Sequence, residues 1–577
     1  MTTAYLIDVE PGDWMAAYRL ANTLLHAGFA VVWTLEPFDA QGRTYQRGTF
    51  VLPAQGDLTA AASAAARGGV ELVGPVRVEV PLLPLGVPRV AVYGGGGAPY
   101  NYARILAALG FLVEFIEPEA VKGGALKDAD VFMMPGGGLQ AMKGQIDPLG
   151  EPGCRAIDRW VRSGGMYVGS CAGAFDAAIV SESFVAACPA QRCMQLINAR
   201  VWNSLDTEWI GLASPGVGIL RARVARPDHP VMFHLPPSFE IVHYNGPLFE
   251  PAHEVVDGAS EAEGLAIVDG TGERFTPSEY FLRFSGYSGR PGRDTLIGRA
   301  VEAGVRTVVA GTLDRGRVVL FGSHPEFGEN LVMDRVGVPA LMLANAVLWQ
   351  SSVRPRREIR SPQSGAVEQP IEVQAAAARA SARRIVSLAA ELQTASLDPL
   401  PVWLHEDLAM STFGLPGHEV WAQTLSEFTR LAGDLETQLR RLEDAAARAS
   451  ANASAPPSNR GARVSVALRS ASAALAYRVP DSRRRDFGFE GLQQALDRCE
   501  GMLRRAVSGW SVALPPSPNP YAHFESSPYH LAAGSYLAAS GVLANACALV
   551  SACADQLDVH IDAAALEGMA AGFTARG

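Results

Sequence analysis

Short apolar runs recur along the first 350 residues of the chain and alternate with segments of helical periodicity. The runs are rich in Val, Ile and Phe at successive positions, so we expect strands that are covered on both faces. Strands that alternate with helices are typical of an α/β fold with a mostly parallel sheet. The predicted strands are residues 4–9, 30–35, 89–94, 113–118, 130–135, 165–170, 306–313 and 317–324.

Two changes in the sequence predict the domain boundaries. A proline-rich stretch at 81–88 marks the first, and the strand pattern stops after residues 353–365, where Ala, Leu, Arg and Glu begin to dominate. We therefore expect a small βαβ module at 1–86, an α/β domain with flanking helices at 87–352 and an all-α helical bundle at 366–577.

The predicted bundle contains helices at about 368–394, 418–449, 465–478, 487–509 and 528–556, followed by a short closing helix. One of them carries an apolar stripe at three- and four-residue steps, which is typical of a helix with one buried face. This stripe favours packing within the bundle; the alternative is a face that binds a protein partner or a second copy of the chain. The stripe consists of Leu435, Leu439, Leu442, Ala446 and Ala449.

Charge and cysteine usage narrow the class of protein. Of the 577 residues, 48% are hydrophobic, and the net charge of −10 argues against a nucleic-acid partner, since phosphate binding relies on clustered Lys and Arg. The seven cysteines show no CxxC pair, so we expect free thiols and no metal site. No basic region followed by an apolar run opens the sequence, which predicts a cytoplasmic location.

The segment from His530 to Ala554 has no charged residue and is long enough to cross a membrane. Its many Ala, Ser and Gly residues, the central Asn545 and the absence of flanking Lys or Arg argue against a span. We expect a buried bundle helix and no membrane association.

Residues 165–175, GMYVGSCAGAF, predict a strand, a sharp turn and the start of a helix, with Cys171 in the turn. The surrounding small residues permit a strained backbone and close approach, as a nucleophile at the end of a strand requires. Helix amides that follow the turn stabilise developing negative charge, and a thiolate is the reactive form of cysteine. The alternative is an inert thiol that fills a tight corner.

Two other predicted strands end in residues that complement such a cysteine. RVVLFGSHPEF places His324 and Glu326 two positions apart, so the carboxylate can orient the imidazole as a base for Cys171. DVFMMPGGG ends in Gly136, Gly137 and Gly138, whose amides are candidate oxyanion donors. Because ligand sites in open α/β sheets lie at the carboxyl ends of strands, we expect these groups to form one site.

These motifs resemble the class I glutamine amidotransferase-like superfamily, over roughly residues 88–350. GSCAGAFDA, HYNGPLF at 243–249 and FGSHPEF look most like the group named for the amino-terminal domain of some biotin-protein ligases. The resemblance implies a flavodoxin-like parallel sheet, Cys171 as nucleophile, His324 as base and Glu326 as its orienter. It also implies oxyanion donors at the amides of Gly137 and Ala172.

Residues 23–53 resemble a segment that precedes amidotransferase-like domains appended to some zinc carboxypeptidases, but no HxxE pair accompanies them. Zinc chemistry is therefore not implied, and we expect no cofactor. Glutamine-hydrolysing relatives usually read GxCxGxQ, whereas Phe175 stands at the Gln position here. This difference argues against glutamine as the substrate.

The sequence thus favours a cysteine-dependent hydrolase or acyl-transfer enzyme that cleaves an amide C–N bond of a small-molecule or peptide-like substrate through a thioester. The alternatives are a non-catalytic binding or regulatory module and an ammonia-supplying glutamine amidotransferase.

Two further stretches are candidates for the pocket. Residues 93–106, YGGGGAPYNYARIL, join a strand to a helix through four glycines, either as a permissive turn or as an anion site at the helix start. Tyr244 and Asn245 either orient a polar substrate or belong to a simple turn.

Overall fold

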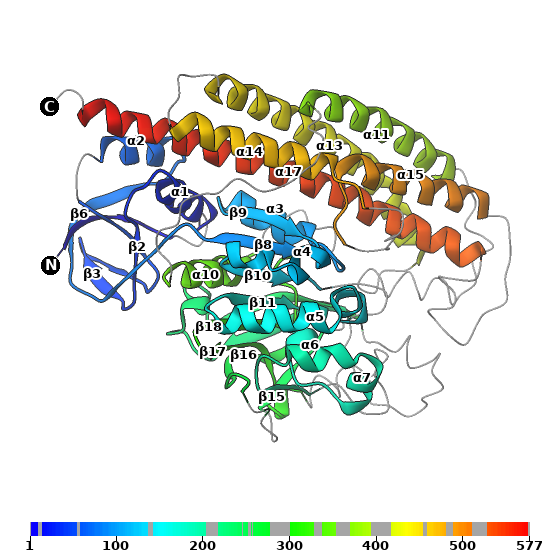
Figure 1. Ribbon diagram of the computed structural model, residues 1–577, viewed down its shortest axis with the longest axis horizontal. Coiled ribbons are helices and arrows are strands. Elements are labelled where there is room, and N and C mark those ends of the chain that lie inside the picture. Colours follow the sequence, from blue (N-terminus) through cyan, green and yellow to red (C-terminus); the bar gives the residue numbers. More distant parts are fainter. Residues whose placement is uncertain are drawn as a thin grey trace.

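The chain is a mixed α/β protein in the computed structural model (Figure 1). The structure describes residues 2–9, 14–54, 58–136, 142–202, 217–244, 246–251, 256, 258–276, 300–327, 337–353, 370–393, 417–453, 459–479, 488–509 and 528–574.

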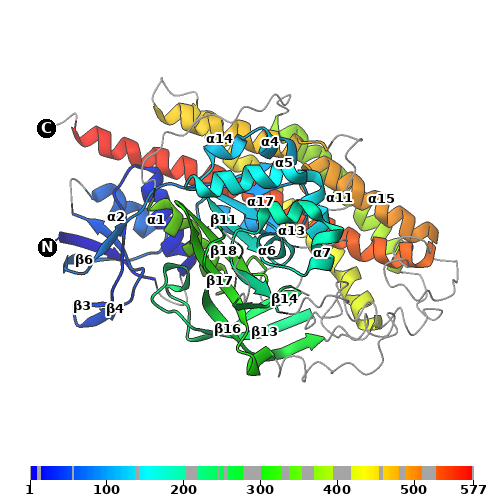
Figure 2. The ribbon, with the colours of Figure 1, turned by 60° about the horizontal axis from the view of Figure 1, so that its bottom comes forward.

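An eleven-stranded sheet forms the centre of the protein, with the order β14-β13-β16-β17-β18-β11-β10-β8-β9, while β12 and β15 pair beside it. The neighbours from β9 to β18 run parallel, and those from β18 to β14 run antiparallel. Figure 2 shows β11, β18, β17 and β16 side by side across this change of direction. The strands are β8 (Arg89–Tyr93), β9 (Leu112–Ile116), β10 (Val131–Met134), β11 (Met166–Ser170), β12 (Ala199–Val201), β13 (Val217–Val224), β14 (Ser238–Tyr244), β15 (Phe249–Pro251), β16 (Glu263–Thr276), β17 (Arg306–Leu313) and β18 (Gly316–Phe321).

The strands predicted in this region are confirmed, and their burial explains why the sequence indicated them. All four residues of β10 and all five of β11 are buried, because helices cover both faces of the parallel half. Those flanking helices are α3 (Tyr100–Ala108), α4 (Pro118–Lys122), α5 (Met142–Arg162), α6 (Ala172–Ala177), α7 (Glu182–Ala187) and α10 (Ala340–Ser351).

A second sheet, with the order β6-β1-β5-β2-β7, lies in the first 84 residues. The predicted βαβ unit is present only in a split form: β5 lies between β1 and β2 and pairs antiparallel with both. The reason is that β5 carries the buried residues Phe50, Val51 and Leu52, which need a central position in the sheet. The elements are β1 (Thr2–Ile7), α1 (Trp14–His26), β2 (Val32–Thr34), β3 (Phe38–Ala40), β4 (Arg43–Tyr45), β5 (Phe50–Pro53), α2 (Thr59–Arg67), β6 (Leu72–Val78) and β7 (Leu82–Pro84).

The C-terminal region consists of long helices that run beside one another over the sheet region (Figure 1). The predicted apolar stripe, from Leu435 to Ala449, is buried in the cluster that these helices share. The last helix differs from the prediction, since α17 continues without a break to Thr574 where we expected a separate closing helix; no proline interrupts that stretch. The helices are α11 (Ile371–Gln393), α13 (Gly417–Ala453), α14 (Asn459–Ala476), α15 (Leu492–Gly509) and α17 (Pro528–Thr574).

Within the part of the chain that the structure describes, one helical segment, Gly541–Glu567 of α17, is long and apolar enough to cross a membrane. Of its apolar window, 67% is buried inside the protein. This burial favours the expected role as a packed helix.

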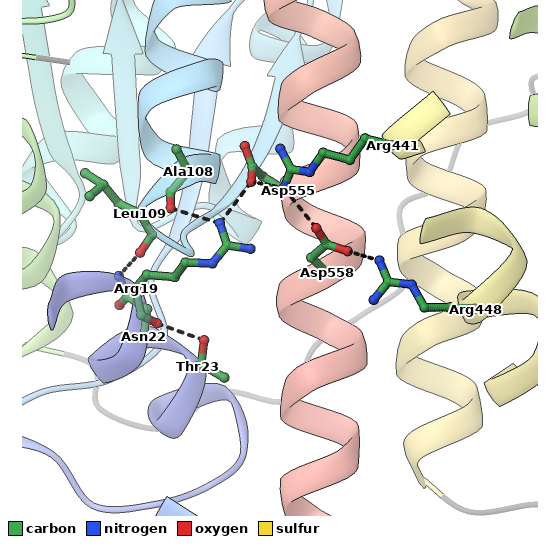
Figure 3. Close-up of polar contacts among 9 residues, drawn as sticks. All are labelled: Arg19, Asn22, Thr23, Ala108, Leu109, Arg441, Arg448, Asp555 and Asp558. Carbon is green, nitrogen blue, oxygen red and sulfur yellow. Dashed lines mark hydrogen bonds and ion pairs between the residues drawn. The ribbon is translucent and has the colours of Figure 1, made fainter. Parts of the chain in front are cut away.

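An alternating series of charges connects α17 to the regions on both sides of it (Figure 3). Asp555 accepts from Arg19 of α1 at 2.9 Å and from Arg441 of α13 at 2.5 Å. Asp558 accepts from Arg441 at 2.9 Å and from Arg448 at 2.7 Å. Because Arg19 also donates to the Ala108 carbonyl at the end of α3, these bonds hold the N-terminal region, the large sheet and the C-terminal helices together.

Candidate active site

Cys171 lies in the predicted sharp turn between β11 and α6. Its φ of 49° and ψ of −113° are unfavourable for a residue with a side chain, so the surrounding packing has to hold this conformation. A Cβ added at Gly169 would lie 2.3 Å from the Gly173 oxygen. A Cβ added at Gly173 would lie 2.1 Å from the Met134 oxygen. Glycine is therefore required at both positions for the turn to close.

His324 and Glu326 follow β18 and are both buried, with exposed fractions of 2% and 1%. The His324 Nδ1 lies 2.8 Å from the Glu326 Oε1, and the Ser170 hydroxyl donates to the same oxygen at 2.7 Å. The backbone amide of His324 donates to the Val242 carbonyl at 2.7 Å, and its ring stacks on Phe327. The imidazole is thus fixed in orientation by a carboxylate, a backbone bond and an aromatic ring.

Gly136 shows how closely Cys171 and His324 approach one another. A Cβ built on Gly136 would lie 2.6 Å from the Cys171 Cβ and 2.7 Å from the His324 Cε1, so one glycine touches both residues. Cys171 itself is 7% exposed. The structure therefore brings together four of the predicted site residues, Gly136, Cys171, His324 and Glu326.

The charges around His324 favour its protonated form. Burial lowers the pKa of the imidazole, but the charges of Cys171 and Glu326 outweigh burial and raise that pKa to about 10. Cys171 therefore lies beside an imidazole whose positive charge is favoured.

A second buried histidine, His243, lies next to this group and was not among the sequence candidates. Its Nδ1 is 3.0 Å from the Ser323 Oγ, which in turn is 3.0 Å from the Thr307 Oγ1. Burial, and then the positive charge of His324, lower the pKa of His243 to about 3, so it is neutral at pH 7. The signal was present in the sequence, because His243 begins the HYNGPLF motif.

Tyr102 of α3 is a further residue that the sequence did not indicate. It is fully buried, and its pKa is raised well above the usual range by burial and by the charges of Glu326 and Cys171. Tyr102 of α3 therefore lies close enough to Glu326 and Cys171 for their charges to change its pKa.

The other predicted residues are distributed as follows. Ala172 is the first residue of α6, and Tyr244 ends β14, with its backbone paired to Val217. The remaining candidates, Gly137, Gly138 and Asn245, lie outside the described residues.

Phe175 and Asp176 occupy α6 behind Cys171. Phe175 is half-buried and packs against the core cluster on that side of the sheet. The Asp176 carboxyl is fully buried without a hydrogen-bond partner among the residues that the structure describes. Burial, and then the charge of Cys171, raise the pKa of Asp176 well above its usual range.

The residues that the structure describes contain no group of three or more His, Cys, Asp or Glu arranged to hold a metal ion.

No family model and no curated protein matches this chain. A putative ThuA-like protein from Bacteroides uniformis matches 48% of this chain and 95% of its own length, with 13% identity and a TM-score of 0.27. A putative ThuA-like protein from Parabacteroides merdae matches 48% of this chain and 93% of its own length, with 13% identity and a TM-score of 0.28. PurLQS from Thermotoga maritima matches 46% of this chain and 97% of its own length, with 14% identity and a TM-score of 0.26. Likenesses at this level decide neither a family nor an activity.

Proposed function

We propose that the chain is a cysteine-dependent hydrolase or acyl-transfer enzyme that acts on an amide C–N bond, with Cys171 as nucleophile, His324 as base and Glu326 as orienter. The observation that carries this proposal is the strained turn that holds Cys171 beside a buried, protonated His324 paired with a carboxylate. A flavodoxin-like arrangement of the parallel strands and membership of the class I glutamine amidotransferase-like superfamily belong to the same proposal.

The reaction follows from these roles. The Cys171 thiolate attacks the amide carbon and forms a C–S bond, and the negative charge moves to the carbonyl oxygen. The proton on His324 passes to the leaving nitrogen as the C–N bond breaks, which leaves a thioester and a free amine. His324 then takes a proton from water, whose oxygen attacks the thioester carbon, and the acid and the Cys171 thiolate are released.

Two groups support the imidazole during these proton transfers. Glu326 compensates the positive charge of His324 and fixes which ring nitrogen faces the carboxylate. Ser170 donates to the Glu326 oxygen that faces His324, and so holds the carboxylate in place. The amides of Ala172 and of the 136–138 segment are the proposed oxyanion donors, by position in the motif.

Phe175 defines the proposed substrate class. An aromatic ring at the position where glutamine-hydrolysing relatives carry Gln supplies no amide group to recognise glutamine. We therefore expect a different small-molecule or peptide-like amide.

The burial of Cys171 favours one alternative, a binding or regulatory module without turnover. Such a module needs the shape of the site but no activated thiol, so the reactivity of Cys171 separates the two functions. Ammonia release from glutamine, lost in Cys171→Ala, would instead support an ammonia-supplying amidotransferase.

The test is the pH dependence of Cys171 alkylation by iodoacetamide, followed by peptide mass spectrometry. We expect the rate to stay high at pH 6, well below the usual thiol pKa of about 8.5, and to fall at least tenfold in His324→Ala. Cys193 is a free, half-buried thiol whose pKa is raised by burial, so it serves as the internal control in the same sample. A Cys171 rate that follows an ordinary thiol and ignores His324→Ala would contradict the enzyme proposal.

A further inference from the structure

The C-terminal region reaches the large sheet through α17, whose Gln556 donates to the Val113 carbonyl of β9 at 3.2 Å, and through residues 488–490, which we name the docking segment. The Phe489 amide donates to the Gly94 carbonyl at 2.8 Å, and the Gly488 amide donates to the Gly97 carbonyl at 3.0 Å. Both acceptors belong to the glycine loop, residues 94–98, between β8 and α3. A Cβ on Gly94 would lie 2.9 Å from the Phe489 Cβ, so the absence of a side chain there permits this approach.

Aromatic side chains fix the docking segment against the sheet. The Tyr100 hydroxyl accepts from the Glu490 amide at 2.8 Å and donates to the Glu490 carbonyl at 3.0 Å. The Phe489 ring stacks on Phe115 of β9, with centroids 3.8 Å apart and planes 10° from parallel. Tyr100 and Phe489 are both buried, which makes this contact part of the protein core.

On its other side the glycine loop contacts the site. The Ala98 amide donates to the Gly136 carbonyl at 2.9 Å, and a Cβ on Gly97 would lie 2.8 Å from the same oxygen. Gly136 is the residue that touches both Cys171 and His324. A continuous series of close contacts therefore leads from the docking segment through the glycine loop to the two reactive side chains.

We propose that Phe489 and Tyr100 are positioning residues of the candidate active site, and that the C-terminal helices thereby set the reactivity of Cys171. The glycine loop is held between the docking segment and Gly136, so loss of the docking contacts lets the loop and Gly136 move away from Cys171 and His324. The thiol and the imidazole then lose the packing that holds them together. This inference rests on the proposed function, because it assumes that Cys171 is activated by His324.

The test uses the full chain and the alkylation rate of Cys171 between pH 5 and pH 9, with Cys193 as internal control. Phe489→Ala should slow the reaction at pH 6 at least tenfold and move its pH midpoint toward 8.5, whereas Phe489→Tyr, which keeps the ring, should restore most of the rate. Tyr100→Phe removes only the hydroxyl and should slow the reaction about threefold. Phe428→Ala is the matched control, because Phe428 is an equally buried aromatic of the C-terminal core on α13.

The control variant should lower thermal stability and leave the Cys171 rate within twofold of the wild type. Unchanged Cys171 profiles in Phe489→Ala and Tyr100→Phe, with an activated wild-type thiol, would overturn the positioning role and leave the proposed function intact. An equal loss of rate in Phe428→Ala would also overturn it, because any loosening of the helices would then have the same effect. An ordinary thiol profile in the wild type would instead overturn the proposed function.

Discussion

The parallel and antiparallel halves of the large sheet contribute differently to the candidate site. The parallel half carries Cys171 after β11 and His324 and Glu326 after β18. The antiparallel half supplies β14, where the Val242 carbonyl accepts from the His324 amide and the buried His243 contacts Ser323, the residue before His324. The difference teaches that the reactive groups come from carboxyl ends of parallel strands, while the antiparallel extension fixes their positions.

The two buried histidines show the same contrast in their charges. The Cys171 and Glu326 charges, outweighing burial, raise the pKa of His324 to about 10. Burial and the His324 charge lower the pKa of His243 to about 3, and its Nδ1 lies 3.0 Å from the uncharged hydroxyl of Ser323. Two adjacent rings are thus held in opposite protonation states at pH 7.

We expect the largest effect on the free energy of unfolding, and comparing two glycine-to-alanine substitutions, one in each half, tests it. In Gly173→Ala the new Cβ would lie 2.1 Å from a backbone oxygen of β10, which cannot move alone, so we expect a loss of about 3 kcal/mol in the free energy of unfolding. In Gly272→Ala the new Cβ lies 2.8 Å from the Ile219 Cγ2 and 3.0 Å from the Glu240 Oε1. These are side-chain atoms of residues that are at least partly exposed, and they shift more easily than a buried backbone oxygen, so we expect about 1 kcal/mol. Urea denaturation measures both, and equal losses would contradict the rigid turn.

A smaller effect should come from His243 in the antiparallel half. The pKa of His243 is lowered on folding, so the unfolded chain binds more protons than the folded chain below pH 6.5. The contribution of the neutral His243 to the free energy of unfolding is therefore complete above pH 6.5 and is lost as the pH falls toward 3. From pH 7 to pH 5 the wild type should lose ~2 kcal/mol of its free energy of unfolding through this histidine. His243→Gln should remove it, and urea denaturation at the two pH values measures the change. A variant with the same pH dependence as the wild type would show that His243 is not held neutral.

The same difference between the halves explains which strands the sequence revealed. Strands β10 and β11 are buried on both faces and consist mainly of apolar residues, so the sequence predicts them clearly. In β13 the exposed Arg221 and Arg223 alternate with buried Leu220 and Ala222, and in β14 polar residues interrupt the apolar ones. One-sided strands of this kind give a weak pattern, so β13, β14 and β16 were not predicted, whereas β17, with its run of buried residues, was.

The candidate site was predictable to the extent that its residues lie in local motifs. Cys171 stands in a turn of small residues, and His324 and Glu326 stand together after an apolar run. Ser170 and Tyr102 were missed because their relation to Glu326 depends on segments far apart in the chain. The docking segment was missed for the same reason, since only the folded chain brings it to the glycine loop.

The protonation state of His324 is the most direct test of the central claim that a thiolate and an imidazolium form the site. Nitrogen-15 NMR of histidine-labelled protein, with the His324 signal assigned by its loss in His324→Gln, follows the titration of that ring. The structure predicts that His324 stays protonated at pH 8, with a midpoint near pH 10 that falls in Cys171→Ala because the thiolate is gone. A midpoint at or below 6.5 in the wild type, unchanged by Cys171→Ala, would contradict the claim.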